Sequence, residues 1–457
     1  MTTGVTGVPS RLICSGCGAE PAVTEAYPFR CPNAGRGDVD HVLARVLDPE
    51  QTGFPGDDMT QPNPFIRYRG LLHSRHRALA GGLPDRDFVG LVEQLDTEVA
   101  RVDGRGFRAT PFARDASVSD ALGFSATGGV WVKDETGNVA GSHKGRHLMG
   151  VMLHLEVAER VGLADPDARP DLAIASCGNA ALAAAVLAAA AGRVLRVFVP
   201  AGADTAITTR LGELGAQVVT CPRPPGAAGD PTYLALRQAL DGGAIPFTCQ
   251  GNENGLVIEG GETLGYEMVT DLRREGTTLD HLVVQVGGGA LASACIQALD
   301  EAAALGALAP LPRVHTVQTA GAHPLERAYH RVRALLPAGA SGAAARHLDA
   351  ALATAASHRS RFMWPWEDEP ASIATGILDD ETYDWLAVVR GMLATDGRPV
   401  VVDEATLAAA HGLAHAGGHH VCATGSSGLA GLMALMEDGT IAAGDRVAVL
   451  FTGADRS

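Results

Sequence analysis

The sequence predicts an α/β fold built on largely parallel β-sheets. Short runs rich in valine, isoleucine and leucine recur along the chain, and alanine-rich stretches of helical character separate them. Short apolar runs are typical of strands buried on both faces, and their alternation with helices is typical of parallel strands joined by helical crossovers. Ligands of such folds gather at the loops that follow the carboxyl ends of strands. Strands are expected at 130–132, 172–175, 195–199, 217–220, 282–286, 314–318, 400–402 and 447–451.

The composition is that of a compact enzyme. The 457 residues suffice for two or three domains with their own cores, and 46% of them are hydrophobic while 19% are charged. The formal net charge of −16 disfavours nucleic acid or an anionic membrane as a partner, because both attract clustered lysine and arginine. No signal peptide or membrane span is expected, and the eight cysteines do not form a disulfide framework. We therefore expect a cytoplasmic protein with reduced thiols.

The N-terminal segment has the pattern of a small zinc ribbon. Cys14 and Cys17 form a Cys-x2-Cys pair, and Cys31 follows at a distance that suits a third ligand. His41 is the best candidate for the fourth ligand, and Asp38 is the next. A degenerate ribbon that has lost its metal is the alternative, so the pattern leaves zinc open.

The most distinctive pattern lies around Lys144. A strand-like segment and an acidic turn precede the run Gly141-Ser142-His143-Lys144, and an apolar helical stretch follows it. A lysine at such a loop-to-helix junction can be partly desolvated, and its amine can then attack a carbonyl group to form a Schiff base. Lys144 is therefore the candidate catalytic residue.

A glycine turn follows the strand expected at 282–286. Gly287, Gly288 and Gly289 lead into a helix that starts near Ala290 and Leu291. Consecutive glycines allow a tight turn of inward-pointing N–H groups, which binds a phosphate dianion together with the helix dipole. The turn lacks the spacing of a dinucleotide-binding motif or a P-loop. A plain strand-to-helix turn is the alternative.

A third loop joins the strand expected at 172–175 to an alanine-rich helix. Ser176, Cys177 and Gly178 can present backbone N–H groups to a substrate carboxylate at the start of that helix. The side chain of Asn179 can hydrogen-bond to a hydroxyl group. An ordinary N-cap turn would have the same sequence.

These loops resemble those of the fold-type II, or tryptophan-synthase-like, enzymes that use pyridoxal 5′-phosphate (PLP). The Lys144 run resembles the Gly-Ser-Phe-Lys-x-Arg signature of threonine synthases and serine/threonine dehydratases, and also the Gly-Ala-His-Lys of tryptophan synthase β subunits. The Asn179 loop resembles their Ser-Gly-Asn motif, and the glycine turn resembles their Gly-Gly-Gly-Gly phosphate cup. The order of the loops matches the family over about residues 105–455, and the segment Ser372–Ile377 resembles a threonine-synthase segment that faces the cofactor.

The resemblance implies a role for each loop. Lys144 would hold PLP as a Schiff base, the glycine turn would bind its phosphate, and Asn179 would contact its 3-hydroxyl group. Thr424, or failing that Ser426, would contact the pyridine nitrogen, and such a neutral partner favours elimination and replacement over transamination. His143 stands where dehydratases usually have phenylalanine, and either a place beside the cofactor or a structural role suits it. Cys177 replaces a more usual serine or glycine and is expected to be a small packing residue.

The resemblance also implies the domain organisation. Two α/β domains are expected, with the cofactor in the cleft between them. Residues 46–145 and 271–457 would form the large domain, residues 146–270 the small one, and residues 1–45 the ribbon-like segment. Since this fold class is commonly dimeric, a homodimer is expected.

The implied function is that of a lyase on a hydroxy or O-phosphorylated amino acid, acting through α-proton abstraction and elimination, as in threonine synthase or threonine dehydratase. A β-replacement synthase that traps aminoacrylate with an external nucleophile is the alternative, because it shares the cofactor motifs. A non-catalytic PLP-binding protein is the third possibility. A substrate phosphate would need fixed cations beyond the glycine turn, and residues of the right type are Arg114, Lys133, Arg146 and Arg210.

Overall fold

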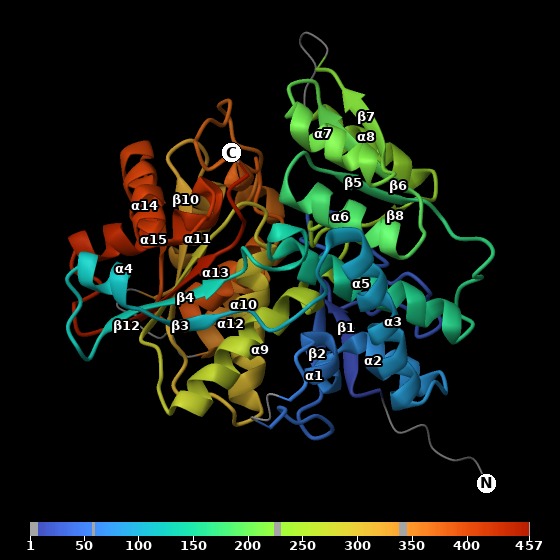
Figure 1. The fold of residues 1–457 in the computed structure, drawn as a ribbon, viewed down its shortest axis with the longest axis horizontal. Helices are drawn as coiled ribbons and strands as arrows, with labels where there is room; N and C mark the ends of the chain where they lie inside the picture. Colours follow the sequence, from blue (N-terminus) through green and yellow to red (C-terminus); the bar gives the residue numbers. More distant parts are fainter. Residues whose placement is uncertain (1–7, 57–59, 224–229, 338–344, 457) are drawn as a thin grey trace.

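Two β-sheets organise the chain in a computed structural model, which describes residues 8–56, 60–223, 230–337 and 345–456 (Figure 1). The larger sheet has the strand order β11-β10-β9-β12-β4-β3. All of its pairings are parallel except that of β3 with β4. Its strands are β3 (Phe112–Asp115), β4 (Gly129–Asp134), β9 (His281–Gln285), β10 (Arg313–Thr319), β11 (Pro399–Val402) and β12 (Arg446–Phe451).

The smaller sheet is wholly parallel and has the order β7-β6-β5-β8. The eight strands predicted from the sequence are all present in the two sheets, so the predicted α/β architecture with largely parallel sheets is confirmed. The prediction did not include the short strands β3 and β8. The strands of the smaller sheet are β5 (Leu172–Ala175), β6 (Leu195–Pro200), β7 (Gln217–Cys221) and β8 (Ile245–Pro246).

Helices cover both faces of the larger sheet. Leu282 and Val284 of β9 are buried in a core with α9, α10 and α13, whereas Val283 between them is buried in a core with α14 and α15. This alternation is the period of two that a pleated strand imposes. The helices around this sheet are α4 (Ala116–Ala121), α9 (Val257–Glu275), α10 (Ala290–Ala304), α11 (Pro324–Arg333), α12 (Ala345–Ala356), α13 (Trp385–Ala394), α14 (Glu404–Ala416) and α15 (Ala423–Glu437).

The smaller sheet shares its core with helices from two parts of the chain. Apolar residues of α2 and α3 are buried in the same core as those of α5, α6 and β5. Part of the segment 46–145 therefore packs against α5 and α6 and shares the core of the smaller sheet, and the domain boundaries stay a prediction. The elements of this region are α1 (Pro64–Arg67), η1 (Arg69–Leu71), α2 (His73–Ala80), α3 (Asp85–Asp103), η2 (Val139–Gly141), α5 (Lys144–Arg160), α6 (Asn179–Ala190), α7 (Thr205–Glu213) and α8 (Pro231–Asp241).

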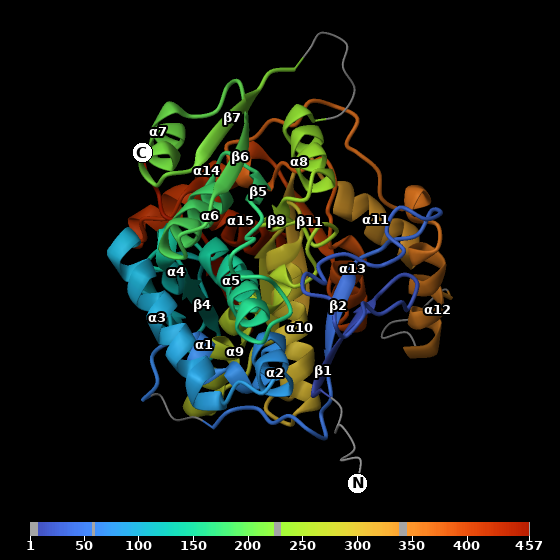
Figure 2. The same cartoon turned by 90° about the vertical axis from the view of Figure 1, so that its right-hand side faces the viewer.

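The N-terminal segment contains an antiparallel pair, β1 (Ser10–Cys14) and β2 (Leu43–Leu47). It lies beside α12 and α13 (Figure 2). The Asp40 amide donates to the Ala356 carbonyl at 2.8 Å, and the Arg359 amide donates to the Asp38 carbonyl at 3.0 Å. None of the described helices combines the length and the apolar character that a bilayer crossing requires.

Candidate active site

Lys144 is the first residue of α5. The loop before it is held against the segment that follows β12: Ser142 forms an isolated antiparallel bridge with Gly453, and the His143 amide donates to the Thr452 carbonyl at 3.1 Å. Because β4 and β12 are neighbours in the larger sheet, the loops that follow these two strands meet at one edge of the sheet. This is the edge where ligands of parallel sheets collect.

Two buried histidines flank Lys144. The imidazole Nδ1 of His143 lies 3.1 Å from the Thr452 carbonyl oxygen, and its Nε2 is buried without a hydrogen-bond partner among the described residues. Burial, together with the nearby positive charge of Lys144, lowers the pKa of His143 well below its usual value, and the same causes lower the pKa of His147 to about 3. Both rings are therefore neutral and add no charge beside the amine.

Two carboxyl groups complete the charged surroundings of Lys144. Burial raises the pKa of Asp379 to about 6 and that of Asp384 to about 7, although the charge of Lys144 acts in the opposite direction on both. The amine itself makes no hydrogen bond or ion pair with the part of the chain that the structure describes. It is therefore available for chemistry.

The glycine turn lies between β9 and α10, where the sequence predicts it. Gly289 is the N-cap of α10 and has a φ of 100°, which favours glycine. A Cβ atom at Gly287 would overlap the Asp379 carboxylate, and one at Gly289 would lie 2.9 Å from the Thr382 side chain. The Asp379 carboxylate thus lies against this turn at the start of a helix, where a phosphate would also be bound.

Asn179 starts α6 and meets the C-terminal segment of the chain. Its Oδ1 accepts a hydrogen bond from Arg456 at 3.1 Å, and a Cβ atom at Gly453 would lie 2.5 Å from its Nδ2. In the same loop the Gly178 amide donates to the Ser176 hydroxyl at 3.4 Å. Cys177 is exposed, so the expectation that it is a packing residue is wrong: the loop before α6 holds it away from the core.

The two candidate hydroxyls near the C-terminus differ in their partners. The Thr424 hydroxyl accepts a hydrogen bond from the Gly376 amide at 3.0 Å. The Ser426 hydroxyl donates to carbonyls of its own helical turn, at 3.3 Å from Cys422 and from Ala423. Thr424 therefore faces another loop of the site, whereas Ser426 is engaged within α15.

A chain of contacts joins the four loops. Gly453 bridges Ser142, approaches Asn179 and accepts a hydrogen bond from the Cys422 amide at 3.0 Å. Gly376 contacts Thr424 on one side, and its carbonyl oxygen would lie 3.3 Å from a Cβ atom at Gly287 on the other. The structure thus brings together all four loops that the sequence singled out, while their chemical roles stay predictions.

The sequence reading missed the acidic run that follows η4 (Thr375–Ile377). Asp379 and Asp384 lie in this run, and one carboxylate oxygen of Asp384 is buried without a hydrogen-bond partner among the described residues. The sequence could have identified this acidic run by its position, because it directly follows Ser372–Ile377, the segment that resembles a cofactor-facing segment.

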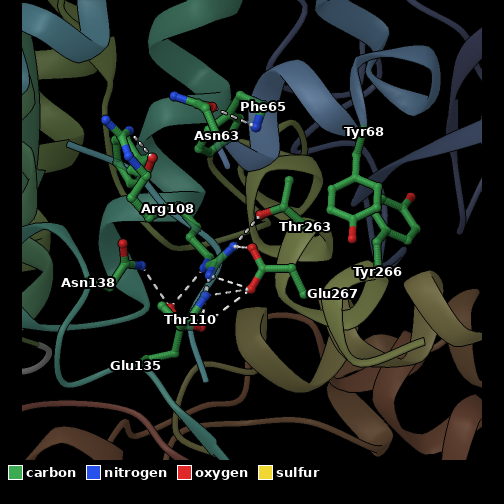
Figure 3. Close-up of polar contacts among 12 residues, drawn as sticks. Asn63, Phe65, Tyr68, Arg108, Thr110, Glu135, Asn138, Thr263, Tyr266 and Glu267 are labelled. Carbon is green, nitrogen blue, oxygen red and sulfur yellow. Dashed lines mark hydrogen bonds and ion pairs between the residues drawn. The ribbon is translucent and has the colours of Figure 1, made fainter. Parts of the chain in front are cut away.

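Two of the four cations that the sequence suggests for a substrate phosphate, Lys133 and Arg146, are buried in ion pairs with glutamates. Arg146 pairs with Glu135 at 2.8 Å and with Glu267 at 2.7 Å, and Lys133 pairs with Glu267 at 2.5 Å; Figure 3 shows how Glu135 and Glu267 converge with Thr110. Arg114 donates to the Gly128 carbonyl at 3.0 Å, and Arg210 lies 3.1 Å from the exposed Glu213. The buried ion pairs leave neither Lys133 nor Arg146 available to a substrate phosphate in this conformation, whereas a role for Arg114 or Arg210 stays a prediction.

Comparisons with known proteins agree with this geometry. Residues 105–453 match the model of a family described as "Pyridoxal-phosphate dependent enzyme". A threonine synthase of Mycobacterium bovis is 28% identical over 352 residues, which cover 75% of this chain and 80% of the relative. A threonine synthase of Methanocaldococcus jannaschii is 24% identical, with coverage of 75% and 74%.

Solved structures share the fold. The processed form of a threonine deaminase from Solanum lycopersicum has a TM-score of 0.55 at 17% identity, and the match covers 82% of this chain and 91% of that one. A diaminopropionate ammonia lyase from Escherichia coli has a TM-score of 0.57 at 17% identity, with coverage of 81% and 89%. The predicted fold type is thereby confirmed.

Proposed function

Because the chain belongs to the pyridoxal-phosphate dependent enzyme family, we propose that it is a PLP-dependent lyase that removes the β substituent of a hydroxy amino acid. One observation carries this proposal. Lys133 and Lys144 are the only two lysines of the chain, and Lys133 is fully buried in an ion pair with Glu267. Lys144, whose amine is not engaged, is thus the one lysine suited to forming a Schiff base.

The residues present fit PLP. The glycine turn Gly287–Gly289, with Ala290 and Leu291 at the start of α10, would hold the phosphate, since its backbone N–H groups lie at a helix N-terminus. Asn179 would contact the ring hydroxyl and Thr424 the ring nitrogen. When bound, PLP supplies an aldehyde for the lysine amine and a ring that stores the negative charge developed at the substrate α carbon.

The protein groups around Lys144 favour proton transfer by its amine. The imidazoles of His143 and His147 are neutral, so they do not repel a proton on the Lys144 amine. The carboxyl groups of Asp379 and Asp384, when ionised, stabilise the ammonium that forms after the amine accepts a proton. The N–H groups of Ser176, Cys177 and Gly178 would bind the substrate carboxylate and so fix the α carbon. We propose that Lys144 removes the α-proton from the substrate held there.

The charges of the site favour a hydroxy amino acid over an O-phosphorylated one. Lys133 and Arg146 are paired with buried glutamates, whereas Asp379 and Asp384 lie near Lys144. A substrate phosphate would meet these carboxylates and be repelled. The named relatives support the lyase class: they are threonine synthases, and the fold neighbours include a threonine deaminase and an ammonia lyase.

Product analysis tests this function. The holoenzyme should release ammonia and a 2-oxo acid from L-serine or L-threonine, and it should be inactive on O-phosphohomoserine and O-phosphoserine. Release of inorganic phosphate from either phosphorylated amino acid, with no reaction on the hydroxy amino acids, would contradict the proposed substrate class. Formation of a new amino acid with an added thiol, in place of the 2-oxo acid, would identify the alternative β-replacement synthase.

We further propose that the N-terminal segment binds zinc through Cys14, Cys17, Cys31 and His41. One ligand atom of each residue lies within 4.8 Å of the others. His41 Nε2 donates to a backbone carbonyl at 3.0 Å, which leaves Nδ1 facing the Cys14 sulfur at 3.7 Å. Metal-binding histidines are commonly oriented in this way. Loss of one zinc ion per chain in a C17S variant relative to the parent, measured by elemental analysis, is the expected result.

The homodimer and the cytoplasmic location also stay predictions. Light scattering coupled to size exclusion would measure the mass against the 47.1 kDa of one chain. A mass near one chain would contradict the dimer.

A further inference from the structure

A second group of metal-binding side chains lies outside the sites described above. His411 and His415 lie one turn apart on α14, and Asp455 lies in the segment after β12. One ligand atom from each residue is within 4.8 Å of the others, and the two imidazole centroids are 4.3 Å apart. A spacing of four residues places both rings on the same face of a helix, as in histidine pairs that bind metals.

The backbone fixes the third member of this group. Ala454 forms an isolated bridge with Val421, and the Asp455 amide donates to the His420 carbonyl at 3.0 Å. The Asp455 carboxylate thereby lies 3.6 Å from Nε2 of His415. Its approach to the histidines follows from the path of the chain.

The two histidines have the nitrogen chemistry that a metal site needs. His415 Nε2 lies 2.9 Å from the Val421 carbonyl oxygen, so this nitrogen donates and Nδ1 carries the lone pair. His411 Nδ1 is buried without a hydrogen-bond partner among the described residues. A buried ring nitrogen without a partner is costly, and a metal ion would satisfy it.

We propose that His411, His415 and Asp455 bind a divalent transition-metal ion such as zinc. Two imidazoles and one carboxylate form a ligand set that zinc and its neighbours in the first transition series accept, with open positions left for water. The proposal depends neither on the N-terminal zinc site nor on the proposed lyase function.

The ion would fix the C-terminal segment against α14. The same segment contains Gly453, which bridges Ser142, and Arg456, which donates to Asn179 at 3.1 Å and to the Ala140 carbonyl at 2.5 Å. Binding should therefore raise thermal stability and support two loops of the candidate active site.

The test compares zinc binding by the holoenzyme and by H415A and D455N variants, using equilibrium dialysis and elemental analysis. H330A is the matched control, since His330 also has a carboxylate nearby, Glu326 at 3.6 Å, but lies outside the three-ligand group. We expect H415A and D455N to bind one zinc ion fewer per chain than H330A. Their affinity for that ion should fall at least tenfold, because even partners outside the ligand set change metal affinity by roughly 10–100-fold.

Zinc should also raise the melting temperature of H330A more than that of H415A or D455N. The test compares variants that all keep the N-terminal cysteines, so zinc bound at those cysteines does not affect the difference between them. D455N changes the charge of the side chain but not its size, so it still tests the site if H415A does not fold. Equal zinc content in D455N and H330A would overturn the proposal.

Discussion

Two groups of charged side chains near Lys144 differ in how their charges are matched. In the first group, Lys133 and Arg146 pair with Glu135 and Glu267, and all four side chains are almost wholly buried. In the second, Asp379 and Asp384 lie near Lys144 without an ion pair, and their pKa values are raised by burial. Matched buried charges hold elements together, whereas unmatched ones near a free amine are typical of functional sites. Lys133 therefore belongs to the structural scaffold, and Lys144 is the candidate catalytic lysine.

The largest effect is expected from breaking the matched group. E267Q removes the carboxylate shared by Lys133 and Arg146, and loss of one partner of a buried ion pair costs about 3–5 kcal/mol. Urea denaturation should show a loss of this order in the free energy of unfolding. E275Q, at an exposed position of the same helix, serves as the control. An E267Q variant as stable as E275Q would contradict the structural role.

The next effect concerns pH. Burial, and then the charge of Asp40, raises the pKa of Asp384 from 3.8 to about 7, so the folded state binds this proton more tightly than the unfolded state. This contribution to stability is present below pH 4 and is lost as pH rises toward 7. A shift of this size corresponds to about 4 kcal/mol. D384N should therefore flatten the fall of apoprotein stability between pH 4 and 8, measured by denaturation at several pH values. If the free energy of unfolding fell equally with pH in D384N and in the parent, the raised pKa of Asp384 in the folded state would be contradicted.

A smaller effect is expected at the glycine turn. The Asp379 carboxylate lies where it would repel a phosphate, so D379N should bind PLP more tightly, by roughly tenfold if about 1.4 kcal/mol of repulsion is removed. The gain should grow above pH 6, where Asp379 is ionised. Fluorescence titration of the apoprotein measures this affinity, with D368N as the control, because Asp368 is exposed and precedes the acidic run. Weaker PLP binding by D379N than by D368N would show that the carboxylate assists the phosphate.

The smallest effect is expected at an exposed pair. Arg210 and Glu213 lie 3.1 Å apart, and both side chains are about half exposed. Exposed pairs contribute roughly 0.2–1 kcal/mol, so R210A should change the free energy of unfolding by less than about 1 kcal/mol. We expect the activity to stay unchanged, because Arg210 pairs with Glu213 at the surface. A clear loss of activity in R210A would favour the sequence-based option that it binds substrate.

The sequence predicted local structure well and long-range pairing poorly. The strands and the glycine turn follow from patterns of neighbouring residues, and they were found where expected. The partner of Lys133 lies 134 residues away, and no local pattern reveals such a contact. The position of α2 and α3 against α5 and α6, and that of Asp379 against the glycine turn, likewise depend on tertiary packing. For the same reason the sequence could offer Arg146 as a substrate ligand although the fold buries it.

The most direct test of the central claim is to identify the lysine that carries the cofactor. The holoenzyme is reduced with borohydride, digested and analysed by mass spectrometry, beside K144R and K133R variants. We predict one cofactor adduct per chain on the peptide that contains Lys144, its retention in folded K133R and its loss in K144R. An adduct on Lys133, or an adduct that persists in K144R, would contradict the assignment of Lys144.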